Sequence, residues 1–252
     1  MKISYLSPGL GLIIILNLLA CQKNEDPAPA PGDGKVKRIL ICFSLDSGSP
    51  SSIVTEFEYD ENGRINRTSS PMYQDGIIMG TISYDLYSYN NNNQLVKKEN
   101  FNANLNSPTG FINLVNHSYS YSKGKMAKET IEYPIAGYSE FMIFEYKNDL
   151  LNTTKFYNNK NQLETYTINQ YDKSDRLVKE TKCAWDDKVI SVTTHNYQGL
   201  LLIKSDVFQG ETHMREIKRS YDSNNNLSIL ESKELSPVSS SLSYILKYEY
   251  FD

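Results

Sequence analysis

The sequence predicts an all-β domain over residues 35–252, built as an antiparallel meander of repeated β-hairpins. Apolar and polar residues alternate along most of this range, and no helical period replaces the alternation. Runs rich in Tyr, Thr, Ile and Val are separated by clusters of Asn, Asp and Gly, which is typical of strands joined by tight turns. Because a sheet with one apolar face must cover that face, we expect a curled sheet, closing partly into a barrel or folding into two layers.

The composition excludes several classes of protein. The 252 residues contain 26 Lys and Arg against 30 Asp and Glu, which gives a net charge of −4. A nucleic-acid-binding protein would show a basic surface, so we expect no nucleic-acid partner. The 19 Tyr and 9 Phe make the chain too aromatic for a disordered protein, and three Cys are too few for a disulfide-rich scaffold.

Residues 1–20 have the features of an export signal. Lys2 supplies a positive charge, and residues 10–20 form an apolar stretch of 11 residues. A membrane-spanning helix needs roughly 20 apolar residues, so this stretch fits a signal that is removed after export.

The stretch ends Leu18-Leu19-Ala20-Cys21, which resembles the lipobox of bacterial lipoproteins. The resemblance implies cleavage after Ala20, thioether lipidation of Cys21 and acylation of the new amino terminus. The alternative is an ordinary secretory signal with an unrelated Cys near its cleavage site.

Residues 21–34 carry this anchor and a linker. The run 22–26, Gln-Lys-Asn-Glu-Asp, does not resemble an inner-membrane retention signal and resembles short charged tags of surface-exported lipoproteins. Alternating prolines in 27–34 favour an extended spacer. We therefore expect an outer-membrane protein held by its lipid and facing the cell exterior, with the periplasmic face as the alternative.

The first strand is expected where Ile39, Ile41, Phe43 and Leu45 alternate with other residues, which places four apolar side chains on one sheet face. A tyrosine then recurs with an aliphatic residue six positions later. Between them lies a three-residue loop whose last residue should adopt the left-handed conformation. These residues are Gly63, Asn93, Asn161, Asp175 and Asn225.

A second class of repeat is one residue shorter. Tyr121, Tyr146 and Tyr197 are each followed by Met or Leu after five positions, so a two-residue turn is expected at 123–124, 148–149 and 199–200. Lys123 is the unusual residue for such a turn. In both classes the tyrosine should face the aliphatic residue across the hairpin. The short gaps around Tyr157 suggest a repeat with an extra internal turn.

The repeat resembles that of tyrosine-aspartate (YD) repeat proteins of the Rhs and teneurin type. The nearest matches are Tyr59-Asp60-Glu61-Asn62-Gly63-Arg64-Ile65 and residues 171–177. The resemblance implies extracellular display and a curved antiparallel sheet, and it implies no catalysis by the repeats.

The tyrosines can be interpreted as core residues or as a sugar-stacking surface, and their aliphatic partners favour the core. The position two residues before each tyrosine is aromatic at Phe57, Tyr87, Tyr119 and Phe144. It becomes polar at Asn169, His195 and Arg219. We therefore take Asn169, His195 and Arg219 as a possible ligand-binding face.

No residue pattern indicates a cofactor, a metal site or a catalytic residue. His117, His195 and His213 lack the spacing of metal ligands, and the acidic turns lack that of calcium loops. There is no Gly-x-Ser-x-Gly motif. Cys42 and Cys183 are expected as free thiols, or as a disulfide if the sheet curls back on itself.

The sequence thus indicates a non-enzymatic surface lipoprotein that binds an extracellular glycan or protein. The alternatives are a purely structural envelope protein and a cryptic hydrolase.

Overall fold

The computed structural model describes residues 35–42, 52–74, 77–235 and 244–250. Lipidation at Cys21 and the signal and linker expected over 1–34 lie outside this range, as do Phe43 and Leu45 of the expected first strand. The strands are β1 (Val36–Cys42), β2 (Ser52–Tyr59), β3 (Ile65–Gln74), β4 (Ile77–Tyr89), β5 (Leu95–Ala103), β6 (Phe111–Ser122), β7 (Lys125–Tyr133), β8 (Tyr138–Lys147), β9 (Leu150–Tyr157), β10 (Leu163–Tyr171), β11 (Leu177–Ala184), β12 (Val189–Gln198), β13 (Leu201–Gln209), β14 (Thr212–Tyr221), β15 (Leu227–Glu234) and β16 (Tyr244–Tyr250).

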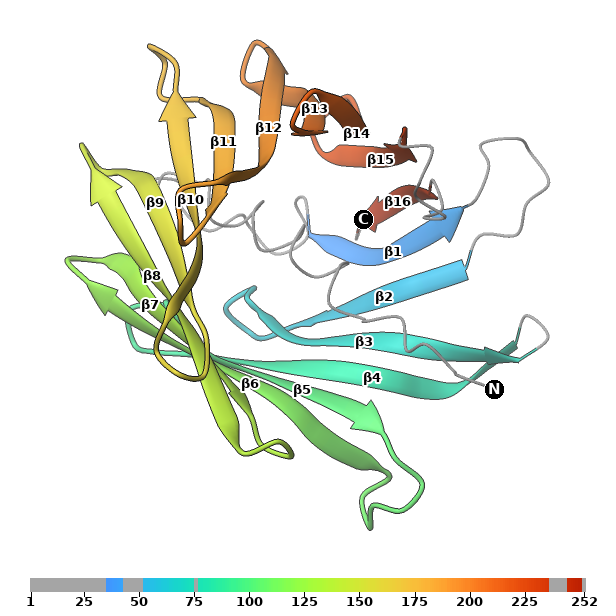
Figure 1. Ribbon diagram of the computed structural model, residues 1–252. Coiled ribbons are helices and arrows are strands. Elements are labelled where there is room, and N and C mark those ends of the chain that lie inside the picture. Colours follow the sequence, from blue (N-terminus) through green and yellow to red (C-terminus); the bar gives the residue numbers. More distant parts are fainter. Residues whose placement is uncertain (1–34, 43–51, 75–76, 236–243, 251–252) are drawn as a thin grey trace, which may run out of the picture.

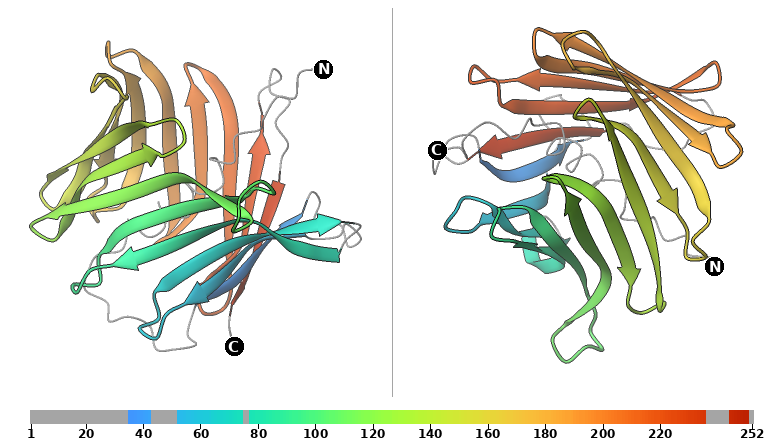
Figure 2. Two further views of the ribbon diagram at one scale, coloured as in Figure 1. Left: turned by 90° about the horizontal axis from the view of Figure 1, so that it is seen from below. Right: turned by 90° about the vertical axis from the view of Figure 1, so that its left-hand side faces the viewer.

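The strands form one closed antiparallel barrel, which confirms the predicted all-β meander. Each strand pairs with its neighbours in sequence, and β1 pairs with β16 to close the sheet. Extensive contacts between strands run only between hydrogen-bonded neighbours in the described part of the chain. The strand order thus forms one sheet that closes on itself (Figures 1 and 2).

The predicted three-residue turns are all present. The hairpin after Tyr59 is closed by the Asp60 amide donating to the Arg64 carbonyl at 2.8 Å. The residues expected in the left-handed conformation have positive φ, namely Gly63 (76°), Asn93 (59°), Asn161 (59°), Asp175 (58°) and Asn225 (63°). Gly, Asn and Asp occupy these positions because larger side chains are strained there.

The residue that follows the tyrosine has its own role in the turn. The Asp60 Oδ1 atom accepts hydrogen bonds from the backbone amides of Asn62 and Arg64, both at 2.9 Å. The same pair of bonds is made by Asn90, Asn158, Asp172 and Asp222. A turn of this kind needs a side-chain oxygen bonded to Cγ, so Asp and Asn serve equally.

The two-residue turns also follow the prediction. Asn148 and Asp149 both have positive φ, and Gly199 has φ 60° as the first residue of its turn. Lys123 has φ 50° and Gly124 has φ 79°, so this turn takes the same mirror-image form in spite of its lysine. Lys123 thus bears a conformational cost that Asn or Gly would avoid.

One expectation about the repeat was wrong. Tyr157 faces Leu163 across a hairpin, as the motif predicts, but this turn lies at the opposite end of the barrel from the other tyrosine turns. It is therefore the ordinary connection between β9 and β10, not an extra turn inside a repeat. We call the end with the turns after Tyr59, Tyr89, Tyr121, Tyr146, Tyr171, Tyr197 and Tyr221 the tyrosine rim, and the other end the opposite rim.

The two faces of the sheet differ in burial. The face that carries the motif tyrosines, here the tyrosine face, also carries Ile39, Phe57, Tyr119 and Leu230, which are buried. The other face carries ion pairs such as Lys97–Glu99 (2.8 Å) and Lys155–Glu145 (2.5 Å). Side chains converge on the concave side of a closed sheet, so we assign the tyrosine face to the inside of the barrel.

Candidate functional site

The motif tyrosines bind neighbouring hairpins together at the tyrosine rim. At this rim every tyrosine hydroxyl except that of Tyr146 donates a hydrogen bond to a backbone carbonyl at or next to the start of the preceding strand, as Tyr89 does to Ile65 at 2.9 Å. Seven such bonds, 2.7–2.9 Å long, join Tyr59 to Val36, Tyr89 to Ile65, Tyr121 to Leu95, Tyr171 to Leu151, Tyr197 to Leu177, Tyr221 to Leu202 and Tyr250 to Leu227. We call these bonds tyrosine staples.

The staples explain why the repeat uses Tyr and not Phe. The ring packs against the aliphatic residue across the hairpin, as Tyr89 does opposite Leu95, and the hydroxyl reaches the adjacent hairpin. Tyr146 is the exception, since its hydroxyl has no hydrogen-bond partner among the described residues and the residue is 38% exposed. The tyrosines are thus core residues of the repeat, which leaves little ring surface for stacking on sugars.

Basic side chains lie over several of these rings. Arg64 lies 4.7 Å from the centroid of the Tyr89 ring, and Arg176 lies 5.1 Å from that of Tyr197. Both arginines also pair with the aspartate that begins their turn. The Asp60 pKa is accordingly lowered, because the Arg64 contacts outweigh desolvation by burial.

The possible ligand residues lie in a second row inside the barrel, two residues along from the staples. Asn169 is on β10, His195 on β12 and Arg219 on β14, so a strand separates each from the next. The structure links two of them through Ser205 on β13. The Ser205 Oγ atom lies 2.9 Å from His195 Nδ1 and accepts a hydrogen bond of 2.9 Å from Arg219 Nη1.

This chain of contacts continues to an acid. His195 Nε2 lies 3.0 Å from a carboxylate oxygen of Glu180. Ser205, His195 and Glu180 thus follow one another as in a serine hydrolase triad, but the two ring nitrogens are exchanged, because the serine of a triad contacts Nε2 and the acid contacts Nδ1. Ser205 is only 2% exposed, however, and its hydroxyl is already held by Arg219. A nucleophile must reach its substrate, and the buried Ser205 hydroxyl does not meet this requirement.

Arg219 is the most unusual member of the second row. Burial lowers the pKa of its guanidinium, and nearby tyrosines oppose that shift. Its Nε atom is buried without a hydrogen-bond partner, and no carboxylate of the described residues forms an ion pair with it. The hydroxyl of Tyr248, at the corresponding position of β16, is likewise buried without a partner.

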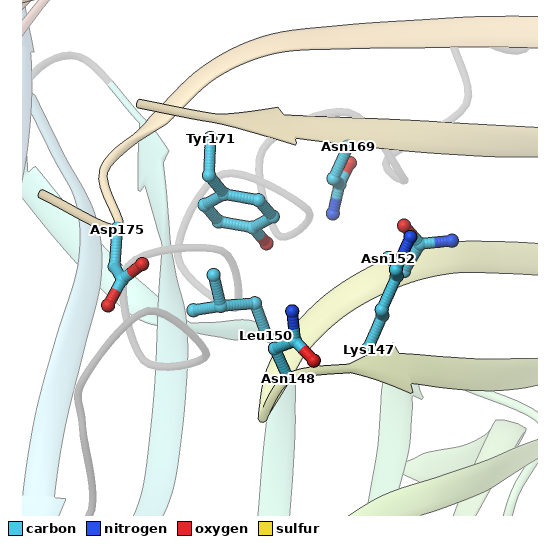
Figure 3. Close-up of a pocket in the computed structure, with 7 residues that line it drawn as sticks. All are labelled: Lys147, Asn148, Leu150, Asn152, Asn169, Tyr171 and Asp175. Atoms are coloured by element: carbon cyan, nitrogen blue, oxygen red, sulfur yellow. The ribbon is translucent and has the colours of Figure 1, made fainter. Parts of the chain in front are cut away.

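Asn169 borders a polar cavity. Its Nδ2 atom donates to the Leu151 carbonyl at 3.0 Å, and its Oδ1 atom is buried without a partner in the described structure. The cavity has a volume of about 260 Å³ and opens at the tyrosine rim between the β8–β9 and β10–β11 hairpins. It is lined by Lys147, Asn148, Leu150, Asn152, Asn169, Tyr171 and Asp175 (Figure 3). A second cavity, of about 170 Å³, is lined by Thr167, Glu180, Lys182, Ser191 and Thr193.

Sequence reasoning missed a buried ionic cluster in the other half of the barrel. Lys98 is 1% exposed and lies 3.4 Å from Asp85, which also accepts a hydrogen bond from Asn100 at 2.7 Å. Desolvation lowers the Lys98 pKa, and the charge of Asp85 opposes this effect. The signal that could have revealed the cluster is Lys98 itself, a charged residue at a position that alternation assigns to the inner face.

The remaining polar candidates are placed as follows. His117 Nδ1 lies 2.7 Å from Glu129, and His213 Nε2 lies 2.9 Å from Asp206. No three His, Cys, Asp or Glu side chains of the described ranges come together as a possible metal site.

Cys183 is buried and free, and the side chain of Cys42 lies outside the described residues. The described residues also contain no helix with the length and apolar character of a membrane span.

Comparisons with known proteins give only distant structural similarity. No family model matches the sequence, and no curated protein matches it. Two matching crystal structures are porin-like proteins. That from Bacteroides vulgatus has 11% identity and a TM-score of 0.41, covering 86% of this chain and 99% of the other. That from Bacteroides uniformis has 10% identity and a TM-score of 0.37, covering 87% and 99%.

A third match is the crystal structure of TcdB2-TccC3-Cdc42, with 12% identity and a TM-score of 0.33. It covers 80% of this chain, which spans only 13% of the chain it matches. At these scores we draw no functional argument from any of the three.

Proposed function

We propose that this chain is a lipid-anchored outer-membrane protein whose barrel binds an extracellular glycan and catalyses no reaction. The observation that carries the proposal is the cavity shown in Figure 3. Its lining supplies three amides, one ammonium group, one carboxylate and the side of a tyrosine ring. Amide groups both donate and accept hydrogen bonds, as sugar hydroxyls require.

The position of the cavity favours access by a ligand from outside the barrel. It opens at the tyrosine rim, and five of its lining residues come from the β8–β9 hairpin or the turn after Tyr171. The staple from Tyr171 to the Leu151 carbonyl, 2.8 Å long, holds the two hairpins in place around it. A rigid polar cavity of this kind loses little conformational entropy when it binds a ligand.

The distribution of charged residues favours a barrel held at the membrane by its lipid anchor over a barrel that spans the bilayer. Lys98 and Asp85 lie on the tyrosine face, and Lys97 and Glu99 lie on the other face of the same region. A barrel that spans a membrane presents one apolar face to lipid, where a charged side chain near the midplane costs about 2–4 kcal/mol. Attachment through Cys21 requires no such face.

Glycan binding is tested with the full-length chain on a glycan and peptide array. We expect binding to at least one glycan, and a loss of about tenfold in affinity for Asn152→Ala, whose amide lines the cavity. Asn196→Ala, at an exposed position of β12, is the matched control and should bind as the unchanged chain does. A silent array would favour a structural role, and binding to peptides alone would replace the glycan with a protein ligand.

The anchor is tested separately. Cys21→Ser should remove partitioning into the detergent phase, because the acyl chains are attached through the thiol. Unchanged partitioning of this variant would contradict lipidation and leave the glycan proposal standing.

A further inference from the structure

Exposed apolar side chains gather at one end of the barrel. Ten large hydrophobic residues of the described chain are exposed, and seven of them lie at or near the opposite rim, namely Met79, Ile82, Leu105, Ile135, Tyr138, Trp185 and Val189. Leu105 is 102% exposed and Ile135 is 62% exposed. The tyrosine rim has two such residues, Tyr146 and Leu200.

Five of these seven exposed apolar residues lie on three adjacent hairpins. β3–β4, β5–β6 and β7–β8 are neighbours in the barrel, because β4 pairs with β5 and β6 pairs with β7. The loop from 104 to 110 and the turn from 134 to 137 contain no charged residue. Figure 1 shows the β5–β6 loop projecting well beyond the body of the barrel. By contrast, most turns of the tyrosine rim contain Asp, Glu, Lys or Arg.

The spacing of these side chains decides what kind of partner fits them. Strands lie about 4.8 Å apart, so successive hairpin tips are separated by about 10 Å. The apolar side chains therefore protrude singly and do not form the continuous packed patch that a protein partner requires. A fluid lipid interface accepts separate insertions, and aromatic and aliphatic side chains are those that enter it.

The length of the tether allows this contact. β1 begins at Val36 on the tyrosine rim, and residues 22–35 separate it from Cys21. An extended chain of 14 residues spans about 43 Å at about 3.1 Å per residue. This equals the length of β4, the longest strand, at about 3.3 Å per residue. The anchor can thus sit in the bilayer on which the opposite rim rests.

We propose that Met79 and Ile82 of β4, together with the uncharged tips of β5–β6 and β7–β8, form a second membrane contact, which inserts into the lipid interface and turns the tyrosine rim away from the bilayer. The inference rests on the membrane anchor of the proposed function and is independent of glycan binding. The contact also directs the polar cavity outward.

The position of each rim can be measured with a single tryptophan. The chain contains one Trp, at 185, so Trp185→Phe removes the native signal. Leu105→Trp in this background places a probe on the opposite rim, and Leu200→Trp places a matched probe on the tyrosine rim, at a site that is 86% exposed. Both full-length variants are reconstituted on phosphatidylethanolamine–phosphatidylglycerol vesicles whose acyl chains carry bromine, and flotation reports whether the anchor holds them.

We expect bromolipid to reduce emission from the probe at 105 about twofold and to leave the probe at 200 nearly unchanged. Adding Ile135→Ser and Met79→Ser to the variant with the probe at 105 should weaken its quenching. The protein should float with and without these two substitutions. Equal quenching of both probes, or none at 105 in floating protein, would overturn the proposal, and the anchor would stand. Failure to float would overturn both.

Discussion

The tyrosine staples allow a stability prediction with an internal control. Tyr89→Phe removes the hydroxyl that donates to the Ile65 carbonyl at 2.9 Å and keeps the ring that packs opposite Leu95 and under Arg64. The net contribution of one such hydrogen bond is about 1 kcal/mol, and the loss is larger if the carbonyl stays buried without a partner. For a domain of this size, 1 kcal/mol lowers the melting temperature by about 2–4 °C.

Tyr146→Phe is the control. Tyr146 faces Leu151 and has Lys125 over its ring at 5.2 Å, so its setting resembles that of Tyr89. Its hydroxyl makes no hydrogen bond within the described structure. We therefore expect a change in the free energy of unfolding of less than about 0.5 kcal/mol.

The measurement is urea unfolding of both variants, followed by far-ultraviolet circular dichroism, with the slope m compared to detect a change in the unfolded state. If Tyr146→Phe destabilises the barrel as much as Tyr89→Phe, the hydroxyl bond is not the reason for the tyrosine. If neither variant changes the midpoint, the staples contribute nothing that unfolding can measure.

Three further predictions concern the turns and the tyrosines. Asn90→Ala, which removes the acceptor of two amide hydrogen bonds, should cost about 1 kcal/mol in the same assay, whereas Asn90→Asp keeps that oxygen and should be nearly neutral; equal losses would show that the oxygen is not what matters. Lys123→Asn should raise the free energy of unfolding by about 0.5 kcal/mol, because Asn tolerates the φ of 50° better, and a loss of stability would contradict the strain. Burial raises the pKa of Tyr59, Tyr89 and Tyr250 to about 12, so between pH 10 and 12 the folded chain keeps protons that the unfolded chain has lost. Stability should therefore fall as pH rises through this window, and a flat profile from pH 9 to 12 would refute the burial of these hydroxyls.

Much of the fold could be predicted from the sequence, because the conformation of each turn restricts which residue types occupy it. The positions of Gly63, Asn93, Asn161, Asp175 and Asn225 fixed the turns, because few residue types adopt positive φ without strain. The tyrosine and aliphatic spacing then fixed which residues face each other across each hairpin. The assignment of Tyr157 failed because the same turn chemistry serves both ends of a hairpin array, and a motif of seven residues does not state to which end it belongs.

The candidate site could be predicted from the sequence only in part. Alternation placed Asn169, His195 and Arg219 on one face, but not their partners, since Ser205 and Glu180 come from other strands and their contacts depend on register. The cavity beside Asn169 likewise requires two hairpins to be placed relative to each other.

The sequence by itself determined the all-β meander, the turns of the tyrosine rim and the pairing across those turns, because each depends on residues close together in the chain. The lipid anchor at Cys21 stays a prediction of the same local kind. Only the tertiary structure decided that the sheet closes through β1 and β16. It also revealed the tyrosine staples between hairpins and the apolar opposite rim. These features depend on how far each hairpin is rotated from the next, and that angle arises from the packing of the whole sheet, not from any one turn.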